Sequence, residues 1–276
     1  MTPFPNLAES QLSQAIRLVG ENGFEPALVS FFQAVCAPDN VLILAFRSAG
    51  PPLVLYRQST NPQVFSQLDQ TYLAGAYRLD PFYDLHLRRA PAGSYRIADI
   101  APDAFQRSRY FIEYYEQTTL IDEITFVAHP SPWVTLNICI GRDASSGQRF
   151  SPRDVETCAR INPLVAAIAE PHWADLARAT GPAEDTSILL ADAARAAYGI
   201  VLSPRQAEVA LMILRGHSTA SIALRLGLSA QTIKVFRKQL HARCRMVWWR
   251  RRFTTAPSWS IARLNRSRRI SSKGRF

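Results

Sequence analysis

Apolar residues change their spacing along the chain, and these changes predict the elements of an N-terminal domain. Residues 9–35 hold two stretches with helix-like patterning. Two short apolar runs follow at 41–46 and 53–57, separated by SAGPP, and predict two strands joined by a turn. Apolar and polar residues alternate over 134–140, which is the period-two pattern of a strand with one buried face.

Further elements are predicted between and after these strands. Helices are expected over 61–77 and over the aromatic-rich stretch 102–117, and two adjacent strands around a proline turn over 122–143. A serine cap, a first-turn proline and an acidic third position begin a helix over 152–170, with a kink at Pro163. Helices that flank a sheet of four or five strands predict an α/β/α sandwich of ordinary single-domain size.

The C-terminal part of the chain carries start and stop signals for three short helices. Ser203, Pro204 and Gln206 form a capping box with a proline in the first turn. The serines that cap the next two helices and the glycines that end the first two are Ser218, Ser229, Gly216 and Gly227. Two short helices joined by LGLS have the spacing of a helix-turn-helix.

The last of these helices, over 230–243, has two unlike faces. Ile233, Phe236 and Leu240 fall at i, i+3 and i+7, so they form one apolar stripe. At 100° per residue, four side chains point away from that stripe: Gln231, Lys234, Val235 and Lys238. An ordinary solvated helix face is one interpretation of this outward row.

DNA contact is the other interpretation, because the second helix of a helix-turn-helix lies in the major groove. Lysine can donate to guanine, glutamine pairs with adenine, and arginine suits phosphate oxygens. On double-stranded DNA we expect base edges to be contacted by Gln231, Lys234 and Lys238, with Val235 on the same face. We expect phosphates to be contacted by Thr232, Arg237 and Arg243.

Residues 202–244 resemble the helix-turn-helix of LuxR-type transcription regulators. The family pattern L-[ST]-P-R followed by a glutamate is matched by 202–205 and Glu208. Its later glycine, Ile-Ala and glycine positions are matched by Gly216, Ile222, Ala223 and Gly227. The family's T-V-K-x-H is TIKVF here, so Phe236 replaces a histidine, and Ala220-Ser221 replace a polar pair.

The resemblance implies a transcription regulator in which Lys234 and Lys238 contact bases. Such domains usually continue into a fourth amphipathic helix that supports dimerisation, so the resemblance leaves a homodimer as one possible assembly. In this chain the sequence after Cys244 has no such amphipathic pattern.

The stretch YLAGAYRLDPFYDL at 72–85 resembles the autoinducer-binding domain of quorum-sensing receptors for acyl-homoserine lactones. The resemblance implies that Asp80 accepts a hydrogen bond from a ligand amide, with Tyr72 and Tyr77 lining the pocket. The spacing is one residue shorter than in the receptors, and the tryptophans expected near this region are absent. Alternatively, Asp80 caps a helix and the tyrosines are ordinary core.

We therefore expect an α+β protein of two domains with a tail. Residues 1–176 form the α/β/α sandwich, a sensing or ligand-binding domain, and 177–198 hold a linker and a connecting helix. Residues 199–244 form the all-α helix-turn-helix domain. The stretch 245–276 shows no sustained period after Phe253, contains Pro257, and is expected to be a disordered basic tail.

The basic charge of the chain lies at its end. The net charge is +10, and residues 209–276 contain 16 Lys plus Arg but no Asp or Glu. Ten of these cations lie in 245–276. That tail is either an arm that adds phosphate contacts and base stacking or the product of a frame shift in GC-rich DNA. A non-specific nucleic-acid or membrane-surface binder driven by the tail is the alternative function.

The sequence does not indicate an enzyme, a metal site or a membrane-spanning protein. Its five histidines and four cysteines show no C-x-x-C or H-E-x-x-H spacing, and no G-x-S-x-G or phosphate-cradling loop occurs. No apolar run reaches membrane-spanning length, and the N-terminus lacks a secretory signal. We expect a cytoplasmic protein that is not an enzyme and uses no cofactor, metal or membrane.

Overall fold

The computed structural model describes residues 6–47, 50–178 and 185–252. These residues divide into two compact units, each made from more than one stretch of chain. The first unit consists of Met1–Ser66, Pro81–Ile100 and Thr118–Ala183, and the second of Gln67–Asp80, Ala101–Gln117 and Glu184–Phe276.

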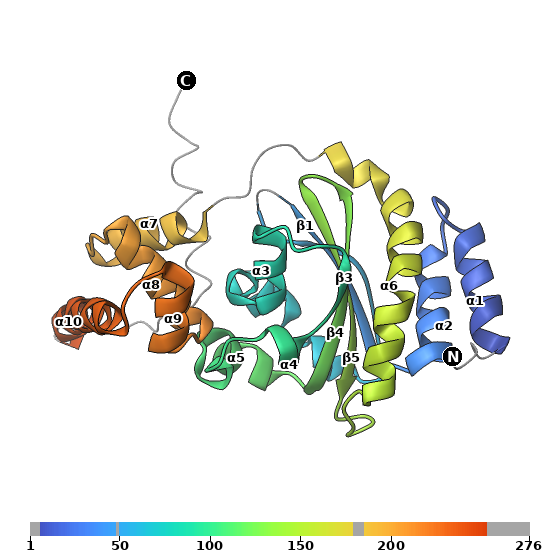
Figure 1. Ribbon diagram of the computed structural model, residues 1–276, viewed down its shortest axis with the longest axis horizontal. Helices are drawn as coiled ribbons and strands as arrows, with labels where there is room; N and C mark the ends of the chain where they lie inside the picture. Colours follow the sequence, from blue (N-terminus) through green and yellow to red (C-terminus); the bar gives the residue numbers. More distant parts are fainter. Residues whose placement is uncertain (1–5, 48–49, 179–184, 253–276) are drawn as a thin grey trace. The chain divides into compact units, whose positions relative to one another are not determined.

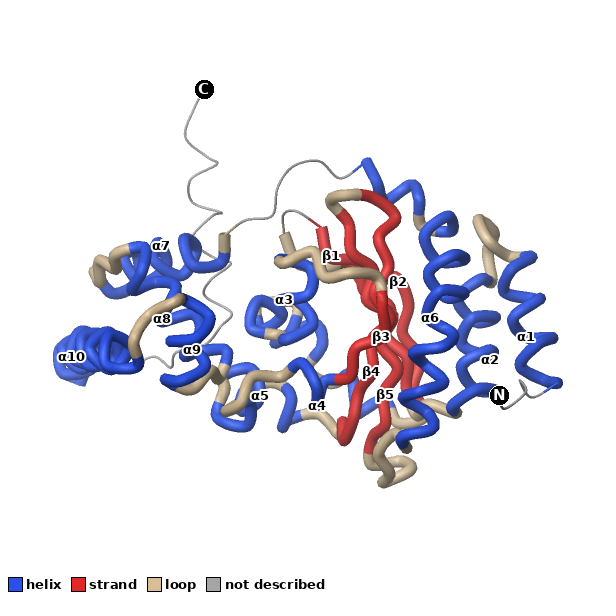
Figure 2. Tube along the Cα trace, in the orientation of Figure 1, coloured by secondary structure: helices blue, strands red, loops and turns tan. Residues whose placement is uncertain are grey.

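One antiparallel sheet forms the centre of the first unit (Figure 2). Its strands are β1 (Asn40–Arg47), β2 (Leu53–Ser59), β3 (Gly93–Arg96), β4 (Leu120–Ser131) and β5 (Val134–Asp143), in the order β2-β1-β5-β4-β3. The strands predicted at 41–46, at 53–57 and within 122–143 are thus confirmed. β3 was missed, because four residues of mixed polarity are too short to show a period.

Helices cover both faces of this sheet (Figure 1). On one face lie α2 (Phe24–Cys36) and α6 (Pro152–His172), with α1 (Asn6–Arg17) packed against α2. On the other face lie α3 (Pro81–Leu87) and α4 (Ile97–Ile100). The expected α/β/α layering is therefore present, and the helices predicted within 9–35 and over 152–170 are confirmed.

The main hydrophobic core lies between the sheet and α2 and α6. The Phe32 and Phe126 rings stack with centroids 5.1 Å apart, which joins α2 to β4. The alternate residues of β5 that face this core are Val134, Leu136, Ile138 and Ile140, all buried. The residues between them are also buried, so the expectation of a single buried face was wrong: α3 and its neighbours cover the second face.

The second unit contains four longer helices and several short turns. The helices are α7 (Thr186–Tyr198), α8 (Pro204–Arg215), α9 (Thr219–Leu226) and α10 (Ala230–Arg252). The helix predicted within 177–198 and the three predicted after it are confirmed. Residues 179–184 of the expected linker lie outside the described residues.

Two predicted helices are broken into single turns. The stretch 61–77 holds η1 (Pro62–Phe65), a π turn η2 (Leu68–Tyr72) and the start of η3 (Ala76–Leu79). Gly75, at φ 157°, interrupts the run between the last two. The stretch 102–117 holds η4 (Phe105–Arg107), α5 (Arg109–Glu113) and η5 (Tyr115–Gln117), because Ser108 caps a new helix in its middle.

The basic tail begins as helix. α10 extends to Arg252, beyond the expected end of the helix-turn-helix domain at 244, and the disorder expected of the tail stays a prediction. No proline or glycine interrupts the sequence between Gly227 and Pro257, and Met and Arg are good helix formers. The remainder of the tail lies outside the described residues. In the described part of the chain, no helix is both long enough and apolar enough to span a membrane.

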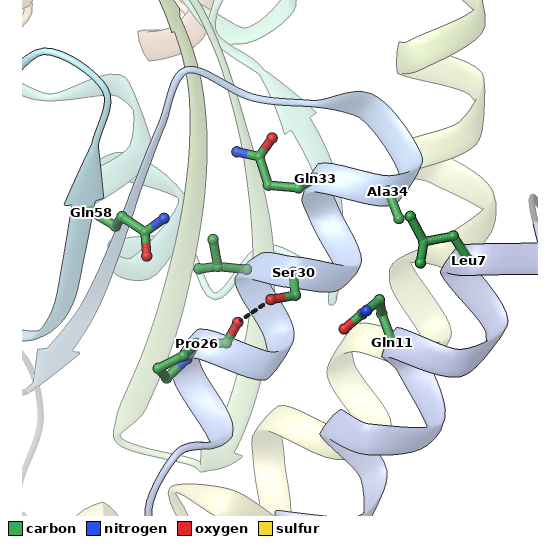
Figure 3. Close-up of a pocket in the computed structure, with 8 residues that line it drawn as sticks. Leu7, Gln11, Pro26, Ser30, Gln33, Ala34 and Gln58 are labelled. Carbon is green, nitrogen blue, oxygen red and sulfur yellow. Dashed lines mark hydrogen bonds between the residues drawn. The ribbon is translucent and has the colours of Figure 1, made fainter.

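An open hollow of about 350 Å³ lies between α1, α2 and β2 (Figure 3). It is lined by Leu7, Gln11, Pro26, Val29, Ser30, Gln33, Ala34 and Gln58. The Ser30 hydroxyl donates to the Pro26 carbonyl at 2.9 Å. No charged side chain is among these lining residues, so this hollow has no acid, base or metal ligand.

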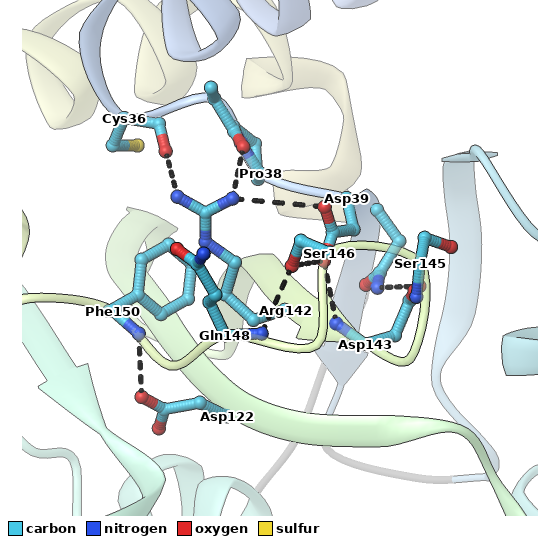
Figure 4. A network of polar contacts seen from close by, with 12 residues as sticks. Cys36, Pro38, Asp39, Asp122, Arg142, Asp143, Ser145, Ser146, Gln148 and Phe150 are labelled. Atoms are coloured by element: carbon cyan, nitrogen blue, oxygen red, sulfur yellow. Dashed lines mark hydrogen bonds and ion pairs between the residues drawn. The ribbon is translucent and has the colours of Figure 1, made fainter.

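Polar side chains close one end of the sheet (Figure 4). Arg142 on β5 donates to the Ala37 carbonyl at 2.7 Å and to the Cys36 carbonyl at 3.0 Å, which fastens the end of α2. Asp122 on β4 is fully buried. It accepts hydrogen bonds from Arg96 Nη2 at 2.5 Å, from Arg96 Nε at 3.1 Å to each of its oxygens, and from the Phe150 amide at 3.1 Å. These bonds join β3, β4 and the segment before α6.

Replacing Asp122 with alanine should lower the free energy of unfolding by about 3 kcal/mol, because it leaves the Arg96 guanidinium and the Phe150 amide without their acceptor. Urea unfolding followed by circular dichroism measures the loss. Glu156→Ala, an exposed change on α6, is the control and should cost under about 0.5 kcal/mol. Equal losses in the two variants would show that the buried pair does not stabilise the sheet.

Candidate DNA-binding surface and ligand site

The helix-turn-helix of the second unit is built on one small core. Val209 of α8, Ile222 of α9 and Ile233 of α10 are fully buried, and Leu240 is nearly so. Phe236 packs against them and is half-buried. The apolar stripe predicted on α10 is therefore confirmed, and its burial fixes the rotation of α10 about its own axis.

Caps set where each helix begins. The Ser203 hydroxyl accepts from the Gln206 amide at 3.3 Å, and the Gln206 side chain accepts from the Ser203 amide at 3.1 Å, so the predicted capping box is present. The Gln206 side chain also donates to the Gln239 side chain at 3.0 Å, which ties α8 to α10. The Ser229 hydroxyl accepts from the Thr232 amide at 3.0 Å at the start of α10.

Glycines set where the first two helices end. Gly216 follows α8 with φ 92° and Gly227 follows α9 with φ 63°, both in the left-handed region that glycine adopts most easily. Gly227 is the turn between the two helices of the motif, and it directs the chain from α9 into α10. The predicted stop signals are confirmed at both positions.

The outward row of α10 is exposed, as the periodicity predicts. Gln231, Lys234, Val235 and Lys238 are all exposed, and Val235 retains 46% of its accessible surface. Lys234 and Lys238 lie one turn apart, so their ammonium groups extend from one face of the helix. The face carries two cations and an amide.

The three residues predicted at phosphates have different surroundings. The Thr232 hydroxyl lies 2.7 Å from the Ser229 hydroxyl and belongs to the cap. Arg237 is half-buried, and its buried Nη1 atom has no hydrogen-bond partner among the residues that the structure describes. Arg243 donates to the Val201 carbonyl and so ties α10 to the segment that precedes α8. To contact a phosphate through this nitrogen, Arg243 would have to give up its hydrogen bond to the Val201 carbonyl.

The three residues predicted at a ligand lie together in the second unit. Tyr72, Tyr77 and Asp80 are all buried, and the Tyr72 hydroxyl donates to the Asp80 carboxylate at 2.6 Å. The Tyr72 ring lies 6.3 Å from the Tyr77 ring, 6.4 Å from Tyr110 and 5.0 Å from Tyr114. The resemblance therefore pointed to residues that lie together, and Tyr110 and Tyr114 of the 102–117 stretch extend the same aromatic cluster.

A second polar group was missed by the sequence analysis. It lies in the first unit, on the sheet face opposite the main core. His86 Nδ1 is 2.8 Å from the Thr135 hydroxyl, while both amide atoms of Asn137 are buried without a hydrogen-bond partner among the described residues. Burial lowers the pKa of His86 to about 4, so the imidazole is neutral at physiological pH. The polar positions of the alternating strand were the available signal, but they were expected to face solvent.

None of these groups resembles a metal centre. Among the residues that the structure describes, no three His, Cys, Asp or Glu side chains are grouped so that they could hold a metal ion. Cys36 and Cys158 are buried free thiols, and the buried Cys139 thiol donates to the Thr125 hydroxyl at 3.4 Å.

Comparisons with known proteins agree with this geometry. Residues 200–245 match the family described as bacterial regulatory proteins, luxR family. A protein of Aeromonas salmonicida, described as a proposed HTH-type transcriptional regulator in the exeN 3′ region, is 26% identical over 173 residues, which cover 60% of this chain and 87% of that protein.

The structural comparison concerns the other part of the chain. The crystal structure of the VqsR LBD domain from Pseudomonas aeruginosa superposes with a TM-score of 0.51 and 20% identity, covering 61% of this chain and 98% of that domain. This likeness shows a shared fold. Together with the capped helices, the glycine turn and the family match, it leads to one assignment: residues 200–245 are a helix-turn-helix domain of the luxR family of bacterial regulatory proteins, in a chain that also has the fold of the VqsR LBD domain.

Proposed function

We propose that this chain is a transcription regulator that binds specific DNA sequences and whose N-terminal domain senses a small molecule. The observation that carries the DNA proposal is the exposed row of Gln231, Lys234 and Lys238 on α10. Burial of the opposite stripe holds this row outward, and the Ser229 cap places it in the first turns of the helix.

DNA recognition would follow from that placement. With α10 in the major groove, its first two turns reach base edges, where lysine donates to guanine and glutamine pairs with adenine. Arg225, exposed on α9, and Arg237 are suited to the flanking phosphates. From Val209 to Arg252 the sequence holds no Asp or Glu, so no carboxylate of this stretch repels DNA.

Small-molecule sensing is supported by two polar groups. The Asp80 carboxylate is buried and bonded to Tyr72, whose ring clusters with three other tyrosine rings, and it could accept a hydrogen bond from the amide of a ligand such as an acyl-homoserine lactone. Unpaired buried amide atoms are costly, and a ligand would offer Asn137 the partners that the described part of the chain does not supply. The cellular location stays a prediction from the sequence, and the homodimer stays a prediction of the resemblance.

The tail-driven alternative gains no support from the comparisons. The family match ends at 245, just where the most basic stretch of the chain begins. A chain that ends at Arg252 keeps all of α10 and removes most of the uninterpreted tail, so it separates the two hypotheses.

Lys234→Ala should weaken binding to the preferred DNA site by about 1–3 kcal/mol and relax the preference at one base position. The loss follows from removing a donor to a base edge. The measurement is competition binding to a site selected from fragmented genomic DNA and to its single-base variants, using the full chain. Arg225→Ala is the matched control, since loss of a phosphate contact should weaken all duplexes alike.

If Lys234→Ala weakens every duplex equally, α10 does not contact bases through this residue. The chain ending at Arg252 should keep the same discrete sites. If binding is diffuse and disappears with that truncation alone, the helix-turn-helix is silent and the proposed function is wrong.

A ligand that uses Asp80 should raise the melting temperature of the wild-type protein and leave Asp80→Ala unchanged. The expected loss of affinity is at least about tenfold, because a buried charge-assisted hydrogen bond is removed. Thermal melting with N-octanoyl homoserine lactone and its neighbours in chain length provides the measurement. Tyr95→Phe, a change at an exposed hydroxyl bonded to the Pro91 carbonyl, is the control and should respond as the wild type does. An equal shift in Asp80→Ala would place the ligand elsewhere.

A further inference from the structure

Asp103, which lies 115 residues before Ser218 in the sequence, bonds to the N-terminus of α9, the first helix of the helix-turn-helix. The Asp103 carboxylate accepts a hydrogen bond from the Ser218 amide at 2.9 Å, at the N-terminus of α9. Ser218 is the N-cap of that helix, and its own hydroxyl accepts from the Ser221 amide at 3.2 Å. Hydrogen bonding by Ser218 lowers the pKa of Asp103, so the carboxylate is ionised at neutral pH.

Two further hydrogen bonds join the end of α8 and the α8–α9 turn to other segments of the second unit. The Ala104 amide donates to the Gly216 carbonyl at 3.0 Å, and Arg215 donates to the Arg78 carbonyl at 3.2 Å. A Cβ atom on Gly216 would lie 2.9 Å from the Ala104 carbonyl oxygen, closer than side chains approach backbone. The segment around 103–104 therefore packs directly on the turn between α8 and α9, and all of these residues belong to the second unit.

The Asp103–Ser218 hydrogen bond lies where a helix-turn-helix contacts the DNA backbone. The first helix of a helix-turn-helix crosses the DNA backbone, and backbone amides at helix N-termini bind phosphate oxygens. The Ser218 amide is such a donor, and it already holds an anion. A carboxylate oxygen and a phosphate oxygen cannot occupy this donor together.

The residues that contact the α8–α9 turn are close in sequence to the predicted ligand residues. Arg78 lies two residues before Asp80, on the turn that carries Tyr77. Ser108 follows Ala104 by four residues and caps α5, whose Tyr110 ring lies 6.4 Å from Tyr72. The two short segments that touch the α8–α9 turn thus carry the Tyr72–Asp80 pair and its aromatic neighbours.

We propose that residues 103–104 act as an intramolecular latch, in which the Asp103 carboxylate takes the place of a DNA phosphate at the N-terminus of α9. The latch and DNA then compete for one surface, and opening the latch increases DNA affinity. This inference rests on the proposed DNA-binding function. It adds a regulatory contact that needs only this chain.

The test measures the affinity of the full chain for the DNA site selected with the wild-type protein. Asp103→Ala should bind that site about fivefold more tightly or better, the range of a regulatory coupling. Asp103→Asn retains an acceptor oxygen without the charge, so its gain should be smaller. Glu116→Ala removes one exposed negative charge from the same unit, far from α9 in sequence, and controls for a general charge effect.

Thermal melting of each variant establishes that it is folded, and Asp103→Asn decides the question if Asp103→Ala does not fold. Folded Asp103 variants that bind the site no more tightly than wild type, or no more tightly than Glu116→Ala, overturn the latch. In that case discrete binding by the wild type still upholds the proposed function. If wild type and variants alike select no discrete site, the proposed function fails first.

Discussion

Burial of a single apolar stripe orients the outward row of α10, which we propose to contact DNA bases. Ile233 and Leu240 are inside the core of α8, α9 and α10, so the rotation of α10 is fixed by packing. The Gln206–Gln239 bond and the Arg243–Val201 bond hold the same helix at two further points. Packing on the buried face of α10 therefore sets the direction of the exposed lysines on its other face. A substitution that loosened this core would shift the outward row even though no residue of the row had been changed.

Local signals account for the parts of the structure that could be predicted from the sequence. Serine caps, Pro204 and the glycines at 216 and 227 act within a few residues, so the three helices of the motif could be placed before the fold was known. The exposure of Lys234 and Lys238 followed from periodicity alone. The meeting of Tyr72 and Asp80 followed from a resemblance and not from periodicity.

Tertiary packing accounts for what could not be predicted. The 102–117 stretch has a helical composition, yet its tyrosines join a shared aromatic cluster and Ser108 starts a new helix within it. Alternation in β5 predicts one buried face, but it carries no information about a second layer of helices, so Asn137 was not expected in the interior. The Ala104–Gly216 contact joins residues more than a hundred positions apart, and no local pattern specifies it.

Gly216 satisfies two separate demands. It ends α8 in a left-handed conformation, and it leaves room for the Ala104 carbonyl and the Ser108 side chain. The first demand belongs to the helix-turn-helix alone, whereas the second comes from a segment in the other half of the sequence. A domain graft would expose the difference: a foreign luxR-type module that ends its first helix with asparagine could keep its own fold, yet it would not seat against residues 104 and 108. A replacement module would therefore need a glycine at this turn to fit against residues 104 and 108.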